Sequence, residues 1–97
     1  MINSVSLVRI EGPTSIYIEA SITEEGDLVV SDQDIGEAPL EYMGDSDYEY
    51  SLRIRAAHKD DLLLALLEKL YSGDARLVSE LREYLDSKGI PAEFGSF

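Results

Sequence analysis

The chain has 97 residues, of which 44% are hydrophobic, and a formal net charge of −12 at pH 7. This length predicts a single domain over residues 1–97, and the apolar content is too high for a disordered acidic chain. The absence of cysteine excludes disulfides, thiolate catalysis and zinc sites built on sulfur. Because the chain start has no signal-peptide pattern and no apolar stretch approaches the ~20 residues that span a bilayer, we expect a cytoplasmic bacterial protein without a membrane partner.

The negative charge is concentrated in one part of the chain. Between Ile10 and Leu52 there are twelve acidic residues and no lysine or arginine, whereas residues 53–97 hold seven bases against eight acids. Solubility alone would accept acids anywhere, but a long segment without a base creates a continuous negative field that attracts cations or basic proteins. The sign of the charge is wrong for direct nucleic-acid binding. The composition therefore predicts a binding surface for a basic protein partner.

The first half of the chain has the two-residue apolar period of β-strands. Val5 and Leu7 are expected to share one face, and residues 16–22 alternate between apolar and polar side chains. Glu24-Glu25-Gly26-Asp27 predicts a hairpin turn that leads into a short strand over residues 28–30. These segments predict an antiparallel sheet.

A further strand is predicted over residues 48–56, where aromatic and aliphatic residues alternate with polar ones. Arg53 and Arg55 fall on the side opposite the apolar residues. From that side they could pair across the sheet with Glu19 or Glu49, which would neutralise part of the acidity internally.

The second half of the chain has helical spacing. A leucine-rich stripe starts near His58 and ends at Gly73, and Asp74 is expected to cap a second helix that stops at Lys88-Gly89. The tail, residues 92–97, is expected to add a short C-terminal strand or to pack across the helices. The fold class predicted is α+β, with three or four antiparallel strands followed by two helices packed on one face.

Residues 31–47 are predicted to form an acidic loop, which is longer than most connections inside a compact domain and therefore a place to look for function. Its six acids alternate with apolar and aromatic residues, a combination that suits a protein interface because apolar groups supply affinity and charges supply on-rate and selectivity. The alternative is an ordinary solvated loop with Leu40 or Tyr42 in the core. The predicted partner-binding residues are Asp32, Asp34, Glu37, Glu41, Tyr42, Met43, Asp45 and Asp47.

Carboxylates two residues apart in this segment, near glycine, also allow a divalent-cation site such as one for calcium. The two stretches with this spacing are Asp32-Gln33-Asp34-Ile35-Gly36 and Asp45-Ser46-Asp47-Tyr48-Glu49. Neither has the spacing of an EF-hand, so no metal site is assigned and the cation site remains an alternative. The only histidine, His58, lies at a predicted helix start, and no glycine-rich phosphate loop is present. We therefore expect a non-enzymatic protein with no catalytic residues and no cofactor.

Three features in chain order resemble a group of small bacterial proteins of unassigned function. They are the segment Gly44-Asp45-Ser46-Asp47-Tyr48-Glu49-Tyr50, the leucine-rich helix, and the closing Lys88-Gly89-Ile90-Pro91. The resemblance spans about residues 12–97 and implies a fold but no activity.

In size, acidity and lack of catalytic groups the chain is also similar in type to bacterial immunity proteins, which cover the active site of a basic toxin, often a nuclease, with carboxylates. This similarity implies an immunity or inhibitor function that masks a nuclease or another nucleic-acid-binding protein. The alternatives are a mimic of nucleic acid, a calcium-binding domain, and a structural protein that forms a homodimer through a sheet edge or through the tail around Phe94 and Phe97.

Overall fold

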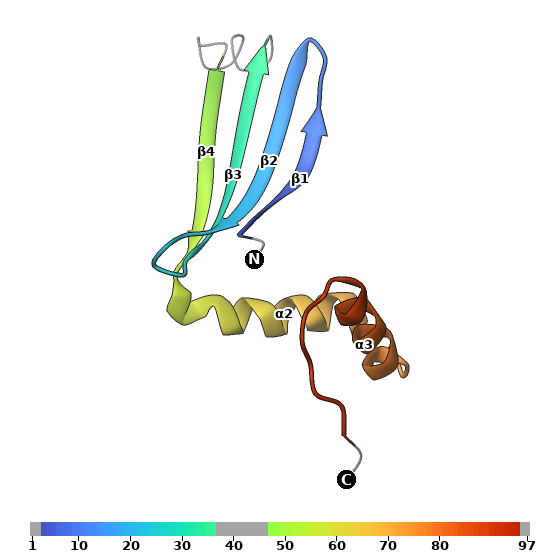
Figure 1. Cartoon of the computed structure of the whole chain (residues 1–97). Coiled ribbons are helices and arrows are strands. Elements are labelled where there is room, and N and C mark those ends of the chain that lie inside the picture. The colour runs from blue at the N-terminus through green and yellow to red at the C-terminus, as the bar shows by residue number, and fades with distance from the viewer. Residues whose placement is uncertain (1–2, 37–46, 96–97) are drawn as a thin grey trace. The chain divides into compact units, whose positions relative to one another are not determined.

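The protein has four strands followed by two helices, and a computed structural model describes residues 3–36 and 47–95 of it. The strands form one antiparallel sheet in the order β1-β2-β3-β4 (Figure 1). The α+β class, with a four-stranded antiparallel sheet followed by two helices, is confirmed. The elements are β1 (Ser4–Ile10), β2 (Thr14–Ile22), β3 (Leu28–Gly36), β4 (Asp47–Ile54), the 3₁₀ turn η1 (Ala56–His58), α2 (Lys59–Tyr71) and α3 (Leu77–Ser87).

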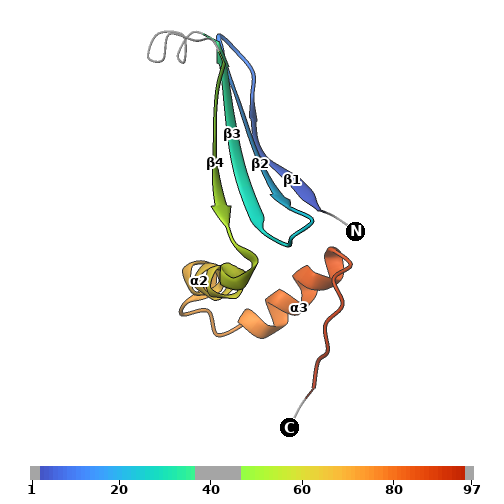
Figure 2. The ribbon, with the colours of Figure 1, turned by 90° about the vertical axis from the view of Figure 1, so that its left-hand side faces the viewer.

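The chain divides into two compact units, Met1–Leu62 and Leu63–Phe97. No hydrophobic side chain among the described residues is buried. Since leaving out one unit can only raise the exposure of the other, neither unit encloses a hydrophobic core by itself. The sheet is therefore a single layer, which Figure 2 shows nearly edge-on.

The register of the sheet defines its two faces, because residues directly opposite on paired strands point to the same side. Ile18 of β2 lies opposite Asp32 of β3, which lies opposite Tyr50 of β4. The side that carries these residues is named the apolar face. The aliphatic residues that share it are Val5, Val8, Ile10, Ile16, Ile18, Ala20, Ile22, Leu28, Val30, Leu52 and Ile54.

The two-residue alternation that placed Val5 and Leu7 on one face is interrupted in β1. The register shifts between Ser6 and Val8, so Val8 lies opposite Ile18 and Leu7 is the extra residue of a β-bulge. A bulge moves every later side chain of the strand to the other side, which simple alternation does not anticipate.

The third strand is longer than predicted, and this corrects the acidic loop expected at residues 31–47. Residues 31–36 belong to β3, which pairs with β2 over its full length and with β4 as far as Ile35. Pairing on both sides outweighs the low strand propensity of aspartate and glutamine. The strand ends at Gly36, where φ is 132° and an added Cβ would collide with the Pro13 carbonyl oxygen, so only glycine fits.

Asp27 ties the β2–β3 hairpin to the end of β4. It is the one buried side chain among the described residues, with 4% of its surface exposed. Its Oδ2 accepts hydrogen bonds from Arg53 Nη1 at 3.0 Å and Arg55 Nη1 at 3.1 Å, and its Oδ1 accepts one from the Ala56 amide at 2.8 Å. The expectation that these arginines pair with Glu19 or Glu49 within the sheet is therefore replaced by a shared bond to Asp27.

The hairpin turn itself forms as predicted. Gly26 has a φ of 84°, and Thr23 Oγ1 accepts a hydrogen bond from the Asp27 amide at 3.1 Å. The Ala56 amide is the main cause of a pKa for Asp27 below its ordinary value, with Arg53 and Arg55 adding to it and the burial of the carboxylate opposing it.

The helices begin and end on local signals. Asp60 and Asp61 lie in the first turn of α2, where negative charge is favoured. Asp74 Oδ1 accepts from the Arg76 amide at 2.9 Å, so Asp74 closes a turn just before α3, which starts at Leu77. Residues 90–95 have no regular secondary structure, so the described part of the tail lacks the short C-terminal strand.

The Asp27→Asn variant tests how strongly this carboxylate holds the sheet together. Because the variant removes the acceptor charge for two arginines, we expect the melting temperature at pH 7 to fall by roughly 5–10 °C. Glu24→Gln makes the same charge change at an exposed position in the same turn and should shift it by less than about 2 °C. Circular dichroism at a series of temperatures measures both.

The wild type and the Asp27→Asn variant should also differ in how their melting temperatures depend on pH. Since the folded-state pKa of Asp27 lies below the ordinary value of 3.8, its charge stabilises the fold above that pH, and the stabilisation is lost as pH falls through the folded-state pKa. The wild-type melting temperature should fall more steeply than that of Asp27→Asn below about pH 4, until the two curves meet. Parallel curves over the whole range would contradict this role of Asp27.

Candidate functional site

Asp32 and Asp34 form the acidic pair, two carboxylates on the apolar face of the sheet. They are two residues apart on β3, so both side chains leave the sheet on the same side. Ile18 lies opposite Asp32 on β2, and Ile16 lies opposite Asp34. The pair thus interrupts a mainly aliphatic face, in an interior strand where a hydrophobic residue would be expected.

The two carboxylates share few hydrogen-bond donors. Asp32 Oδ2 accepts from the Tyr50 hydroxyl at 2.8 Å. The Oδ1 atoms of Asp32 and Asp34 are shielded from solvent and have no hydrogen-bond partner among the described residues. A shielded carboxylate oxygen without a donor costs free energy in the folded state, so the pair is not explained by stability.

The pKa of Asp34 also indicates that the charge of the acidic pair disfavours the folded state. Asp34 has a pKa above its ordinary value, because it shares a hydrogen bond with the Asp32 carboxyl, because burial disfavours its charge, and because Asp32 is negative. No lysine or arginine lies in β2 or β3 to offset this repulsion. A cationic group placed at the pair would take the place of the shared proton and supply the missing donors.

The surroundings decide which kind of cation fits. No group of three or more histidine, cysteine, aspartate or glutamate side chains that could hold a metal ion occurs in the part of the chain that the structure describes. The two carboxylates are flanked by Ile16, Ile18 and the ring of Tyr50, so a long cationic side chain could pack its stem on apolar groups while its head meets the carboxylates.

The structure brings together part of the predicted site. Asp32 and Asp34 lie side by side, and Asp47 is the first residue of β4, opposite Ile35. The other predicted partner-binding residues, Glu37, Glu41, Tyr42, Met43 and Asp45, lie outside the described residues.

From the sequence, Tyr50 was counted only among the alternating aromatic and aliphatic residues of its strand and was not connected with the acidic pair. In the structure Tyr50 is 50% exposed and binds Asp32. Side chains alternate between the two faces along both β3 and β4, and this alternation places Asp32 and Tyr50 on the same face, so it could have predicted the contact. That alternation was missed because residues 31–36 were read as a loop.

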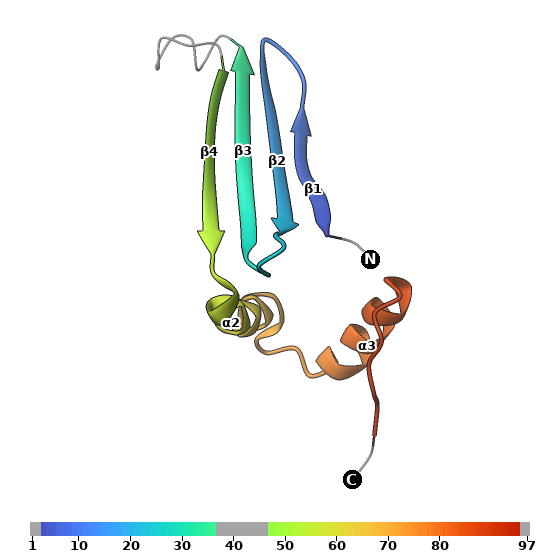
Figure 3. The ribbon, with the colours of Figure 1, turned by 60° about the vertical axis from the view of Figure 1, so that its left-hand side comes forward.

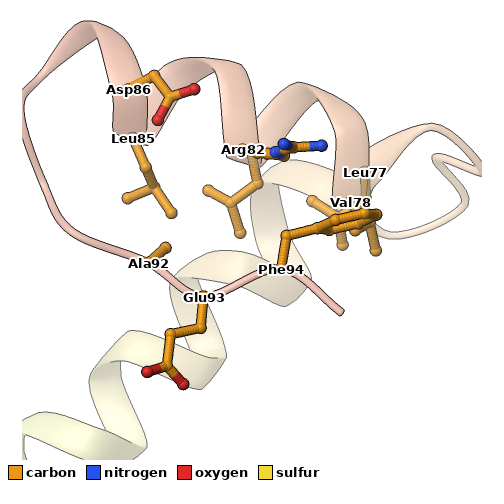
Figure 4. A pocket seen from close by; sticks show the side chains of 9 residues that line it. Leu77, Val78, Arg82, Leu85, Asp86, Ala92, Glu93 and Phe94 are labelled. Atoms are coloured by element: carbon orange, nitrogen blue, oxygen red, sulfur yellow. The ribbon is translucent and has the colours of Figure 1, made fainter. Parts of the chain in front are cut away.

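A concave surface lies within the unit Leu63–Phe97, between α3 and the tail. It is a groove of about 480 Å³, lined mainly by aliphatic side chains of α3 such as Leu77, Leu81 and Leu85. Figure 4 shows Phe94 of the tail close to Arg82, whose guanidinium carbon is 4.3 Å from the ring centroid. The charged residues that line the groove are Arg82, Asp86 and Glu93.

Comparisons with protein-family models, with curated proteins and with solved structures find no match to this chain. Among the described residues, no helix is long and apolar enough to cross a membrane.

The Asp34→Asn variant tests the strain in the acidic pair. Since the folded-state pKa of Asp34 is raised above 3.8, its ionisation disfavours the fold, and stability should be lost as pH rises from about 3.8 through the folded-state pKa. Removing the charge should therefore raise the melting temperature at pH 7 by a few degrees, with a smaller gain at pH 3. Glu19→Gln, an exposed residue of β2, is the matched control and should change little. A variant less stable than the wild type at pH 7 would contradict the repulsion inferred here.

Proposed function

We propose that the chain is a non-enzymatic protein-binding module that masks a basic protein partner, in the manner of an immunity or inhibitor protein. One observation carries the proposal. The acidic pair stands among apolar and aromatic side chains on one face of the sheet, with both Oδ1 atoms lacking a donor among the described residues.

The chemistry of the pair favours an arginine or lysine of a protein over a free ion. A guanidinium group presents several N–H donors in one plane and can bond to two neighbouring carboxylates at once. Such charge-assisted bonds to Asp32 and Asp34 would satisfy the Oδ1 atoms that have no donor among the described residues. The partner's aliphatic stem would pack against Ile16 and Ile18.

The distribution of charge adds selectivity and speed of association. The segment between Ile10 and Leu52 contains twelve acids and no base. A field of one sign steers a basic protein toward the sheet and repels acidic competitors. In this proposal the charges of Glu37, Glu41, Asp45 and Asp47 add to that field, and Tyr42 and Met43 supply apolar contacts.

A comparison of capture experiments tests the proposal. Tagged full-length wild type, the Asp32→Asn/Asp34→Asn variant and a Glu24→Gln/Glu25→Gln control are incubated with a lysate of the source organism, and the retained proteins are identified by mass spectrometry. The control removes the same charge from the hairpin turn. We expect a basic protein to be retained by the wild type and the control but not by the acidic-pair variant.

The affinity for that purified protein is then measured at two salt concentrations. The acidic-pair variant should bind about tenfold more weakly or worse, because charge-assisted bonds contribute about 1.5–3 kcal/mol each, and the control should stay within about twofold of the wild type. Wild-type affinity should also decrease between about 50 and 300 mM salt, because screening shortens the reach of the field. Equal losses in both variants, or an affinity that salt leaves unchanged, would rule out the acidic pair as the binding centre.

A further inference from the structure

The two edges of the sheet differ. β1 carries the bulge between Ser6 and Val8, which interrupts regular pairing. β4 pairs with β3 in continuous register from Asp47 to Ile54, and it contains neither proline nor glycine. Figure 3 shows β4 as the outer strand on its side of the sheet. A regular edge strand presents a row of backbone donors and acceptors that can pair with a further strand.

The side chains of β4 are arranged so that the strand complements itself. On the face opposite the apolar face, Glu49 and Arg53 stand at equal distances along the strand on either side of Ser51. When two such strands run antiparallel and cross at Ser51, each Glu49 lies opposite Arg53 of the partner subunit. Opposite charges that face each other across two strands stabilise the pairing, whereas like charges oppose it.

The same crossing point matches the apolar side. Tyr50 and Leu52 stand one residue on either side of Ser51, so each Tyr50 meets Leu52 of the partner subunit. Leu52 is 65% exposed and Tyr50 is 50% exposed. Pairing at this register would bring these partly exposed apolar side chains of the two subunits together.

We propose that two copies of the chain associate edge to edge through β4, antiparallel and centred on Ser51, so that two four-stranded sheets become one continuous sheet. In this register odd-numbered residues of β4 lie opposite odd-numbered residues of the partner subunit, and even-numbered residues lie opposite even-numbered ones. The residues whose backbone N–H and C=O groups point away from β3 therefore lie opposite each other in the two strands. A shift of the centre to Tyr50 or Leu52 separates Glu49 from the partner's Arg53.

The bond between Arg53 and Asp27 does not prevent this contact. Arg53 donates to Asp27 through Nη1, and 45% of its side chain is exposed. A guanidinium group has five N–H donors, so others are left for a second carboxylate. A second copy is the favoured occupant because β4 already contains both halves of the charge pattern.

Cysteine cross-linking tests the register directly, since the chain has no cysteine of its own. In the full-length Ser51→Cys variant the two thiols face each other across the proposed two-fold axis, within the Cα separation of about 4.4–6.8 Å that a disulfide accepts. Ser31→Cys is the matched control, because Ser31 lies opposite Ser51 on the same face but in the interior strand β3. Under mild oxidation Ser51→Cys should form a covalent dimer at least about tenfold faster than Ser31→Cys.

Charge reversal tests the same contact without a thiol. Light scattering should give wild type a mass of twice 10.8 kDa at about 100 μM, and Glu49→Arg should raise the dimer dissociation constant at least about tenfold. Glu24→Arg makes the same charge change in the hairpin turn and should leave the dimer intact.

Three outcomes would overturn the proposal. The first is a wild-type mass of 10.8 kDa together with equal cross-linking of the two cysteine variants. The second is a dimer in which Ser51→Cys cross-links no faster than Ser31→Cys. The third is a dimer that Glu49→Arg weakens no more than Glu24→Arg does.

Discussion

The Asp27 carboxylate is the interaction on which the rest of the sheet depends. Through one side chain it binds the hairpin between β2 and β3 to Arg53, Arg55 and the Ala56 amide at the end of β4. Taken by itself, the unit Met1–Leu62 has no buried apolar side chain among its described residues, so it has no core of its own to hold the strands in register. Within this unit the ladder of backbone hydrogen bonds and the shielded ion pair of Asp27 hold the strands together.

Asp27 and the acidic pair show that aspartate can have opposite effects on the stability of the fold. Asp27 is surrounded by donors, so its pKa is lowered and its charge favours the fold. Asp34 has the Asp32 carboxyl as its neighbour, and the hydrogen bond shared with it, burial and the negative charge of Asp32 together raise the pKa of Asp34, so its charge disfavours the fold. Charged groups that destabilise the fold are common at binding surfaces, where a partner supplies the hydrogen-bond donors or opposite charge that the free protein lacks. This is the physical reason for placing the proposed function at Asp32 and Asp34.

The sequence was sufficient for much of the fold because its periods are clear. Residues 16–22 alternate strictly and form β2, and the glycine of the 24–27 turn has the positive φ that a tight hairpin needs. The extent of β3 was missed because aspartate and glutamine have low strand propensity, and pairing with two neighbouring strands overrode it. The role of Asp27 was missed for another reason. Its donors lie 26 to 29 residues away, and no local pattern encodes that contact.

The acidic pair and the β4 edge occupy neighbouring strands and share one residue, Tyr50, whose hydroxyl donates to Asp32 and whose ring would meet Leu52 of the partner subunit in the proposed dimer. Binding at Asp32 and Asp34 requires access to the apolar face, whereas pairing through β4 uses the outward backbone groups of the edge. Edge pairing therefore leaves β3 free to bind, and it places two acidic pairs on the same side of one continuous sheet. A basic partner with two cationic sites at a matching distance would then bind both pairs, and the second contact would form at a high effective concentration. Self-association and partner binding are thus compatible in this fold, and the first would increase the strength of the second.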